Sequence, residues 1–300
     1  MKRTDLHEYQ NYCVDFLKTH AEAMLILEMG LGKSAISLTA IADLVFDSFD
    51  VSKTLVIAPL RVAKSVWPEE HATWEQASCL QMSVLVGSAK QREAALAAQA
   101  DIYVINRENV KWLVDYLEKH RIPWPFDMVV IDELSSFKNH QSQRWKALKK
   151  VRPKIQRIVG LTGTPAGNGL MDLWAETCLI DNGQRLGRFI GRYREAYFRA
   201  QGMNPYTGVV FNYVPLPGAE EAIYSRISDI SVSMKALDYL DMPDQVAVRH
   251  YVEMDAPERA AYDNMRDDLL VKLGDDTIDA ANAAVLSGKL MQMANGAIYN

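Results

Sequence analysis

Short apolar runs alternate with amphipathic stretches over the first 180 residues of the chain. Runs such as MLIL at 24–27 and MVVI at 128–131 contain no charged residue, which is typical of strands buried on both faces of a parallel sheet. The stretches between the runs repeat apolar residues at helical spacing. Alternation of this kind predicts an α/β fold in which helices cover both faces of a mainly parallel sheet. We predict strands at 24–28, 54–58, 82–86, 101–105, 127–131 and 157–161, and helices at 33–46, 61–76, 88–99, 107–120, 141–151 and 169–180.

The alternation ends at residue 182, and we predict that 1–182 form the main lobe. Residues 183–240 are expected to form a mostly helical insertion. Its predicted parts are a helix over 183–200, a turn at NPYTG (204–208), a strand at VVFNYV (209–214) and a helix over 218–229. The segment 241–255 is expected to return to the lobe through an edge strand at 246–254, and 256–300 are expected to be helical.

A glycine-rich sequence, EMGLGKS at 28–34, lies between the first predicted strand and the first predicted helix. Gly30 and Gly32 allow backbone N–H groups to turn toward an anionic ligand, and the following helix adds its positive N-terminal end. Lys33 would reach the β- and γ-phosphates of a nucleoside triphosphate, and the Ser34 hydroxyl would ligate magnesium. The strand–turn–helix context favours phosphate binding over an ordinary glycine turn.

A pair of acidic residues, Asp132 and Glu133, follows the apolar run at 128–131. Such a pair usually marks a solvated turn. Ligands of open parallel sheets bind at the carboxyl ends of the strands, however, and this pair would lie there. Asp132 would then hold magnesium through water, and Glu133 would orient and deprotonate an attacking water molecule. With Lys33 upstream, the catalytic interpretation is favoured.

These motifs belong to an ordered series that resembles superfamily two helicases, and within them the Swi/Snf-type DNA translocases of a phage or bacterial type. The resemblance extends over nearly the whole chain and implies a RecA-like P-loop lobe. The matching segments are LHEYQ (6–10), EMGLGKS (28–34), LVIAPLRVAKSVWPEEHATW (55–74), DELSSFKN (132–139), LTGTPAGNGLMDLW (161–174), MKALDYLDMP (234–243) and KLMQMANGAIY (289–299).

The resemblance also implies roles for individual residues. Gln10 would read the adenine edge, and the nucleotide-binding loop would comprise Met29, Gly30, Leu31, Gly32, Lys33 and Ser34. Loops on the DNA side would carry Arg61, Lys64, Lys138 and Asn139, and a coupling segment would comprise Thr162, Gly163 and Thr164. The chain departs from the family pattern at Leu27, where a glycine is usual, at Arg61, where a small hydroxyl residue is usual, and at Ser135, where histidine is usual.

The function implied by the resemblance is that of a DNA-dependent ATPase that moves along double-stranded DNA, with ATP and Mg²⁺ as cofactors. Motifs IV to VI, including the arginine finger, do not occur within the 300 residues. We therefore expect full turnover to need a second RecA-like lobe, in cis or in trans, with 256–300 as the bridge toward it. Two alternatives stay open: a non-catalytic ATP- and DNA-binding accessory protein, which an intact Glu133 disfavours, and a P-loop ATPase outside the helicases, which LTGTP disfavours.

Composition limits these possibilities further. The chain has 33 Lys and Arg against 38 Asp and Glu, a net charge of −5, so any DNA contact must come from local basic surface. Two stretches are rich in basic residues, at 146–157 and 185–199. We interpret the first as a solvated helix and the second as a helix packed through its aromatic residues, rather than as DNA contacts. Three cysteines without a C-x-x-C spacing suit a reducing compartment. With neither a signal peptide nor a membrane span visible, we expect a cytoplasmic protein of a bacterial or phage-infected cell with no membrane partner.

Overall fold

The protein is described here by a computed structural model. It describes residues 1–163, 169–203, 210–239, 251–268, 270–273, 276–279 and 283–296. The chain divides into two compact units, Met1–Met242 and Pro243–Asn300, and each unit is described by itself.

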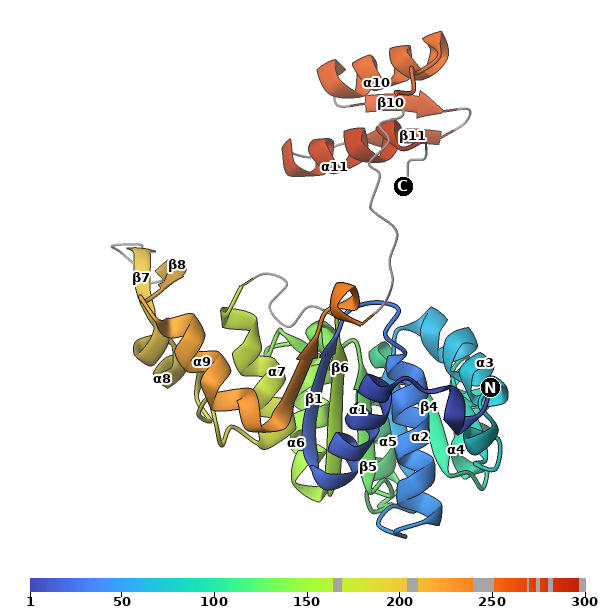
Figure 1. Cartoon of the computed structure of the whole chain (residues 1–300). Helices are drawn as coiled ribbons and strands as arrows, with labels where there is room; N and C mark the ends of the chain where they lie inside the picture. Colours follow the sequence, from blue (N-terminus) through green and yellow to red (C-terminus); the bar gives the residue numbers. More distant parts are fainter. Residues whose placement is uncertain are drawn as a thin grey trace. The chain divides into compact units, whose positions relative to one another are not determined.

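A seven-stranded sheet forms the centre of the first unit (Figure 1). All neighbouring strands in it are parallel. This confirms the predicted α/β class with a mainly parallel sheet. The strand order is β3 (Met82–Leu85), β4 (Ile102–Asn106), β2 (Thr54–Ala58), β5 (Met128–Asp132), β6 (Arg157–Thr162), β1 (Glu22–Leu27) and β9 (Ser231–Met234).

Helices cover both faces of this sheet, because each central strand sends alternate side chains into two separate cores. In β5, Val129 and Ile131 enter one core, whereas Met128 and Val130 enter the other. The first core is closed by α5 (Val110–Lys119), α6 (Gln143–Val151) and α7 (Met171–Asp181). The second core is closed by α1 (Glu8–Thr19), α2 (Lys33–Phe46) and α3 (Trp67–Thr73), as Figure 1 shows.

The strand order brings three of the sequence motifs to one edge of the sheet. Strand β6 lies between β1 and β5, with Ile26 opposite Thr162 and Leu161 opposite Asp132. Because parallel strands end at the same edge, the segments that follow β1, β5 and β6 emerge side by side.

Every strand and helix predicted within 1–182 has a counterpart in the structure, and α2 has the predicted bounds. Two features were not predicted. Helix α1 was not predicted, although its first residues belong to the matched segment LHEYQ. The helix predicted over 61–76 is divided into a π-helical segment (Val62–Val66), α3 and a 3₁₀ turn (Glu75–Ala77). Pro68, at the start of α3, has no N–H to donate, and this favours the change of helical pitch.

The region after residue 182 differs from its prediction. The helix predicted over 183–200 was wrong in part: only α8 (Ile190–Tyr197) is helical, and β7 (Phe198–Met203) pairs antiparallel with β8 (Val210–Pro215). Asn182, Gly183 and Gly187 have positive φ angles, so the residues between α7 and α8 do not form a helix. Helix α9 (Ala219–Ile227) agrees with its prediction, whereas the predicted turn at 204–208 lies outside the described residues.

The edge of the sheet is formed by β9, which the sequence analysis had assigned to the insertion. Of the edge strand predicted at 246–254, residues 246–250 lie outside the described residues and 251–254 have no regular secondary structure. In the second unit, α10 (Ala256–Asp268) and α11 (Ala283–Ala294) agree with the helical prediction, but the antiparallel pair β10 (Leu270–Leu273) and β11 (Asp276–Asp279) was not predicted. Within the described part of the chain, every helix is too short or too polar to cross a membrane.

Candidate nucleotide-binding site

The glycine-rich loop connects β1 to the first turn of α2. Gly30 and Gly32 have φ of 88° and 76°, values that side chains with a Cβ rarely adopt. Lys33 begins α2, and its Nζ donates hydrogen bonds to the carbonyl oxygens of Leu27 at 2.7 Å and Glu28 at 3.1 Å. The ammonium group is therefore folded over the backbone of its own loop.

The N-terminal end of α1 holds the other side of the loop. Gln10 donates from Nε2 to the carbonyl of Leu31 at 3.3 Å and accepts from the His7 backbone N–H at 2.9 Å. A Cβ at Gly32 would collide with Gln10 Nε2, so this close approach requires glycine. Leu31 is fully buried, whereas the Met29 side chain is 89% exposed. The loop is thus anchored at Leu31 and open at Met29.

Asp132 lies at the end of β5 and is held by a residue distant in the sequence. Trp67 is fully buried, and its Nε1 donates to Asp132 Oδ2 at 2.9 Å. Burial raises the pKa of Asp132, opposed by the Trp67 hydrogen bond and the charge of Lys33. Burial likewise lowers the pKa of Lys33, opposed by the charges of Asp132 and Glu133. The ammonium and the two carboxyl groups therefore act on one another electrostatically.

Glu133 has φ 64° and ψ 63°, in the left-handed region. This conformation is uncommon for a residue other than glycine, asparagine or aspartate. The hydroxyl of Ser135 donates a hydrogen bond to Glu133 Oε1. Ser135 is thus the partner of the carboxylate that the sequence analysis predicts to be the catalytic base.

The predicted coupling segment lies between the two motifs. Thr162 ends β6 and is fully buried. A Cβ on Gly163 would lie 3.6 Å from the Leu27 carbonyl oxygen, an ordinary contact. Thr162 and Gly163 therefore adjoin the start of the glycine-rich loop, whereas Thr164 lies outside the described residues.

The four predicted DNA-contacting residues follow neighbouring strands. Arg61 and Lys64 are exposed after β2. Lys138 and Asn139 follow β5, where Lys138 Nζ lies 3.5 Å from Asp172 Oδ2. The side-chain oxygen of Asn139 accepts from the Gln141 backbone N–H at 2.9 Å. Asn139 therefore shapes its own turn, and Arg61 and Lys64 are the more available to a ligand.

Sequence reasoning missed two residues beside this site. One is Trp67, because nothing in its local sequence pattern indicates a hydrogen bond to Asp132. Glu176 on α7 is fully buried, and neither of its carboxyl oxygens has a hydrogen-bond partner among the described residues. Burial, together with the charge of Asp172, raises the pKa of Glu176 to about 9. Its position within the apolar run LMDLWAETCLI was the available signal.

The donor set suits magnesium held together with a nucleotide rather than a metal held by the protein alone. No cluster of three or more His, Cys, Asp or Glu side chains suitable for a metal occurs in the described part of the chain. Mg²⁺ commonly takes one or two carboxylates, substrate phosphates and several waters. Asp132 and the hydroxyl of Ser34, in the first turn of α2, match that chemistry.

A P-loop α/β lobe of the helicase type is the class defined by this fold and these motifs. The model of the SNF2-related domain matches residues 9–183, and the chain belongs to this family.

Known relatives agree with this assignment. Protein p41 of Acyrthosiphon pisum secondary endosymbiont phage 1 is 36% identical over 306 residues, which cover 100% of this chain and 65% of p41. Helicase swr1 of Aspergillus fumigatus is 29% identical over 184 residues, covering 58% of this chain and 10% of that helicase. The chain thus spans less than two thirds of the length of these relatives.

A solved structure shares the fold. The Sulfolobus solfataricus SWI2/SNF2 ATPase core in complex with dsDNA has a TM-score of 0.62 and 21% identity, over 88% of this chain and 52% of that chain. At this identity the likeness establishes the fold alone.

Proposed function

We propose that this chain is the ATP-binding and ATP-hydrolysing lobe of a DNA-dependent ATPase that moves along double-stranded DNA. The observation that carries the proposal is that the glycine-rich loop with Lys33, after β1, and the pair Asp132 and Glu133, at the end of β5, emerge at the same sheet edge on either side of β6. Family membership and the fold support the same reaction class.

In this proposal Lys33 exchanges the carbonyl oxygens of Leu27 and Glu28 for the β- and γ-phosphates of ATP. Ser34 and Asp132 hold Mg²⁺, which would neutralise charge developing on the phosphates. Glu133 orients the attacking water and accepts its proton. The buried indole of Trp67 fixes the orientation of Asp132. Gln10 reads the adenine edge while its amide supports the loop.

DNA would bind at the loops after β2 and β5, which are adjacent strands. Arg61 and Lys64 would contact phosphates directly. Lys138 and Asn139 would contribute from the next loop, with Lys138 released from Asp172. The segment Thr162, Gly163 and Thr164 would transmit the state of the γ-phosphate to these loops.

A second RecA-like lobe, in cis or in trans, would supply the arginine finger. We further propose that 1–182 together with the edge strand β9 make up the ATP-binding lobe, with the rest of 183–240 as its insertion. Residues 256–300 would lead toward the second lobe, and the protein would act in the cytoplasm of a bacterial or phage-infected cell.

Phosphate release with and without duplex DNA tests this function. The chain alone is expected to turn over ATP slowly, and an added second-lobe polypeptide together with DNA is expected to raise the rate. Lys33→Ala should lose nucleotide binding, whereas Glu133→Gln should bind ATP without hydrolysing it. Lys90→Ala, at an exposed position on α4 (Ala89–Ala97), is the matched control and should behave as wild type.

Two results would contradict the proposal. Rapid hydrolysis of ATP by the chain alone, without DNA, would exclude a lobe whose turnover requires DNA and a second lobe. Nucleotide binding with no turnover even when DNA and the second lobe are supplied would instead indicate the accessory protein.

A further inference from the structure

In the described part of the chain, the outer side of strand β9 is an open sheet edge. Among the described residues, no strand pairs with β9 on the side away from β1. The Met234 carbonyl accepts a hydrogen bond from the Glu28 N–H at 3.4 Å, on the β1 side. Because backbone groups alternate along a strand, those of Val232 also face β1, whereas those of Ser231 and Ser233 face the open side.

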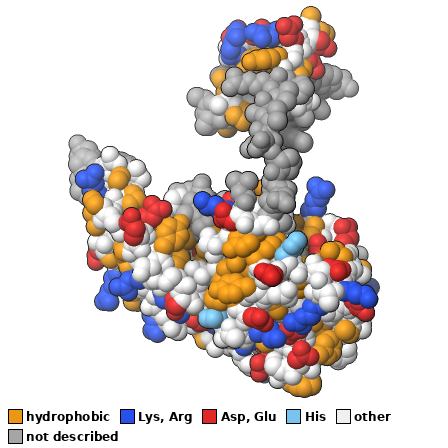
Figure 2. Space-filling view, viewed as in Figure 1, with side chains coloured by type: hydrophobic (Ala, Val, Ile, Leu, Met, Phe, Trp, Pro, Cys, Tyr) orange, Lys and Arg blue, Asp and Glu red, His pale blue; other side chains and the backbone are white. Residues whose placement is uncertain are grey.

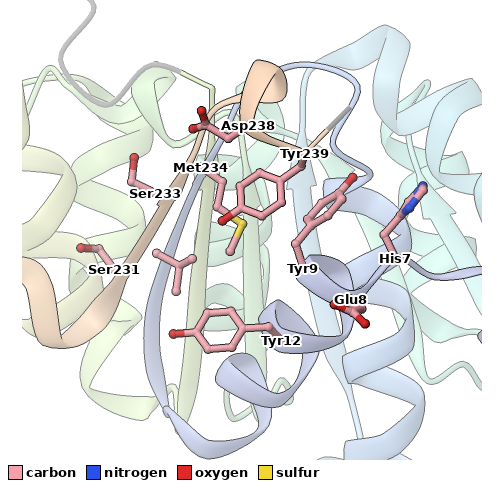
Figure 3. A pocket seen from close by; sticks show the side chains of 10 residues that line it. His7, Glu8, Tyr9, Tyr12, Ser231, Ser233, Met234, Asp238 and Tyr239 are labelled. Atoms are coloured by element: carbon pink, nitrogen blue, oxygen red, sulfur yellow. The ribbon is translucent and has the colours of Figure 1, made fainter. Parts of the chain in front are cut away.

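A cavity of about 880 Å³ runs along this edge. We call it the edge groove; β9 and α1 line it, with Asp238 and Tyr239 at one end. Figure 3 shows Tyr12 of α1 directed toward the strand across the hollow, with Tyr9 beside Tyr239. Tyr12 is 57% exposed and Tyr239 is 45% exposed. In Figure 2 a patch of hydrophobic side chains occupies this face of the first unit.

The charge of the groove is one-sided. The described residues that line it include the carboxyl groups of Glu8 and Asp238 and no lysine or arginine. A ligand that buries this surface must satisfy two carboxylates and cover an aromatic wall. It must also supply hydrogen-bond partners for the outward backbone groups of Ser231 and Ser233.

We propose that the edge groove binds an extended, basic polypeptide segment of a partner protein, which adds a strand to β9. Main-chain hydrogen bonds to Ser231 and Ser233 provide affinity, as in other cases of strand addition. Alternate side chains of the segment contact the aromatic wall, and a lysine or arginine pairs with Glu8 or Asp238. The four residues of β9 set the segment at about four to six residues.

A second copy of this chain fits the groove less well. Pairing two β9 edges would bring the Glu8 and Asp238 carboxylates of both copies to the same interface, where like charges repel. A basic segment carries the complementary charge. The proposal does not depend on ATP hydrolysis, because no residue assigned to phosphate or metal binding lines the groove.

Peptide binding to the whole chain tests the inference, without ATP present. The probe is a fluorescein-labelled peptide of seven residues in which valine and lysine alternate. Two comparison peptides are tested beside it: one that alternates valine and glutamate, and one in which a proline interrupts the valine–lysine sequence. Fluorescence anisotropy should show the lysine peptide binding at least about tenfold more tightly than either comparison peptide. Hydrogen exchange at Ser231–Met234 should slow on binding.

Variants distinguish the contribution of the β9 backbone from that of the side chains that line the groove. Ser233→Pro removes an outward N–H and should weaken binding about tenfold or more. The double variant Glu8→Lys with Asp238→Lys leaves the strand intact and should invert the preference between the two charged peptides. Tyr12→Ala should weaken binding, whereas Tyr251→Ala, at a tyrosine 87% exposed in the second unit, should not.

Three outcomes would overturn the inference. Equal binding of the lysine and glutamate peptides would remove the charge argument. Displacement of the peptide by ATP would assign the groove to the nucleotide base. Concentration-dependent dimerisation that Ser233→Pro abolishes, without peptide binding, would make a second copy the occupant.

Discussion

At the residue scale, Glu133 combines a left-handed backbone conformation with a carboxylate that is hydrogen-bonded to a neighbouring hydroxyl. Ser135 donates to its carboxylate, at the position where the family resemblance leads us to expect histidine. A hydrogen bond to a charged group contributes roughly 1.5–3 kcal/mol. Ser135→Ala should therefore lower kcat for ATP in the complemented assay by about ten- to a hundredfold, with KM little changed. Steady-state kinetics measure this, and Ser136→Ala, whose hydroxyl has no partner among the described residues, should leave kcat unchanged.

The two glycines of the loop differ in what surrounds them. Gly32 combines positive φ with contact to Gln10, whereas Gly30 has positive φ and nothing within 4 Å. Gly30→Ala should cost roughly 1–2 kcal/mol of stability through backbone strain alone. Gly32→Ala should cost more and also weaken ATP binding, because Gln10 must move. Thermal unfolding with and without ATP distinguishes them, and equal losses in both variants would refute the steric argument.

The buried carboxyl of Glu176 makes stability depend on pH. Its pKa is about 9 in the folded chain and about 4.3 when unfolded. Between these values the folded state binds the extra proton, so the contribution is fully present below about pH 4.3 and is lost as pH rises toward 9.

Glu176→Gln removes this titration and keeps the shape of the side chain. Between pH 5 and pH 8.5 the variant should gain stability relative to wild type by an amount on the order of 4 kcal/mol, with the larger difference at pH 8.5. Urea unfolding at pH 5, 7 and 8.5 measures it, with Glu195→Gln on the exposed face of α8 as the control. If the free energy of unfolding changed with pH in the same way for the variant and wild type, a buried, protonated Glu176 carboxyl would be contradicted.

At the element scale, the segment after Asp132 is fixed by packing between β6 and α7. A Cβ on Gly160 would lie 2.5 Å from Leu134 Cδ2 and 3.2 Å from Ile180 Cδ1. Gly160→Ala should therefore displace the 3₁₀ turn Leu134–Phe137, lower stability by about 1–3 kcal/mol and reduce turnover. Gly191→Ala on α8, with nothing within 4 Å, should instead stabilise slightly. Calorimetry and phosphate release together provide the comparison.

How far the elements follow from the sequence depends on the range of the interactions that fix them. The helix over 33–46 was predicted to the residue because the glycine turn and the apolar run before it mark its start. Strand β9 escaped prediction because four residues, SVSM, carry too little pattern. The hydrogen bond between Trp67 and Asp132 joins residues that are far apart in the sequence. The burial of Glu176 likewise depends on how distant segments pack. Local spacing identified the residues with chemistry but not the residues that hold them.

At the scale of the whole molecule, the sheet and the candidate nucleotide residues lie in the first compact unit, 1–242. Because its two cores are closed by its own helices, residues 1–242 alone should unfold cooperatively. They should bind ATP within about threefold of the whole chain, a difference near 0.6 kcal/mol. If residues 256–300 lead toward the second lobe, removing 243–300 should lower the DNA-stimulated turnover of ATP measured with an added second lobe. Unchanged turnover would show that the second unit has another role.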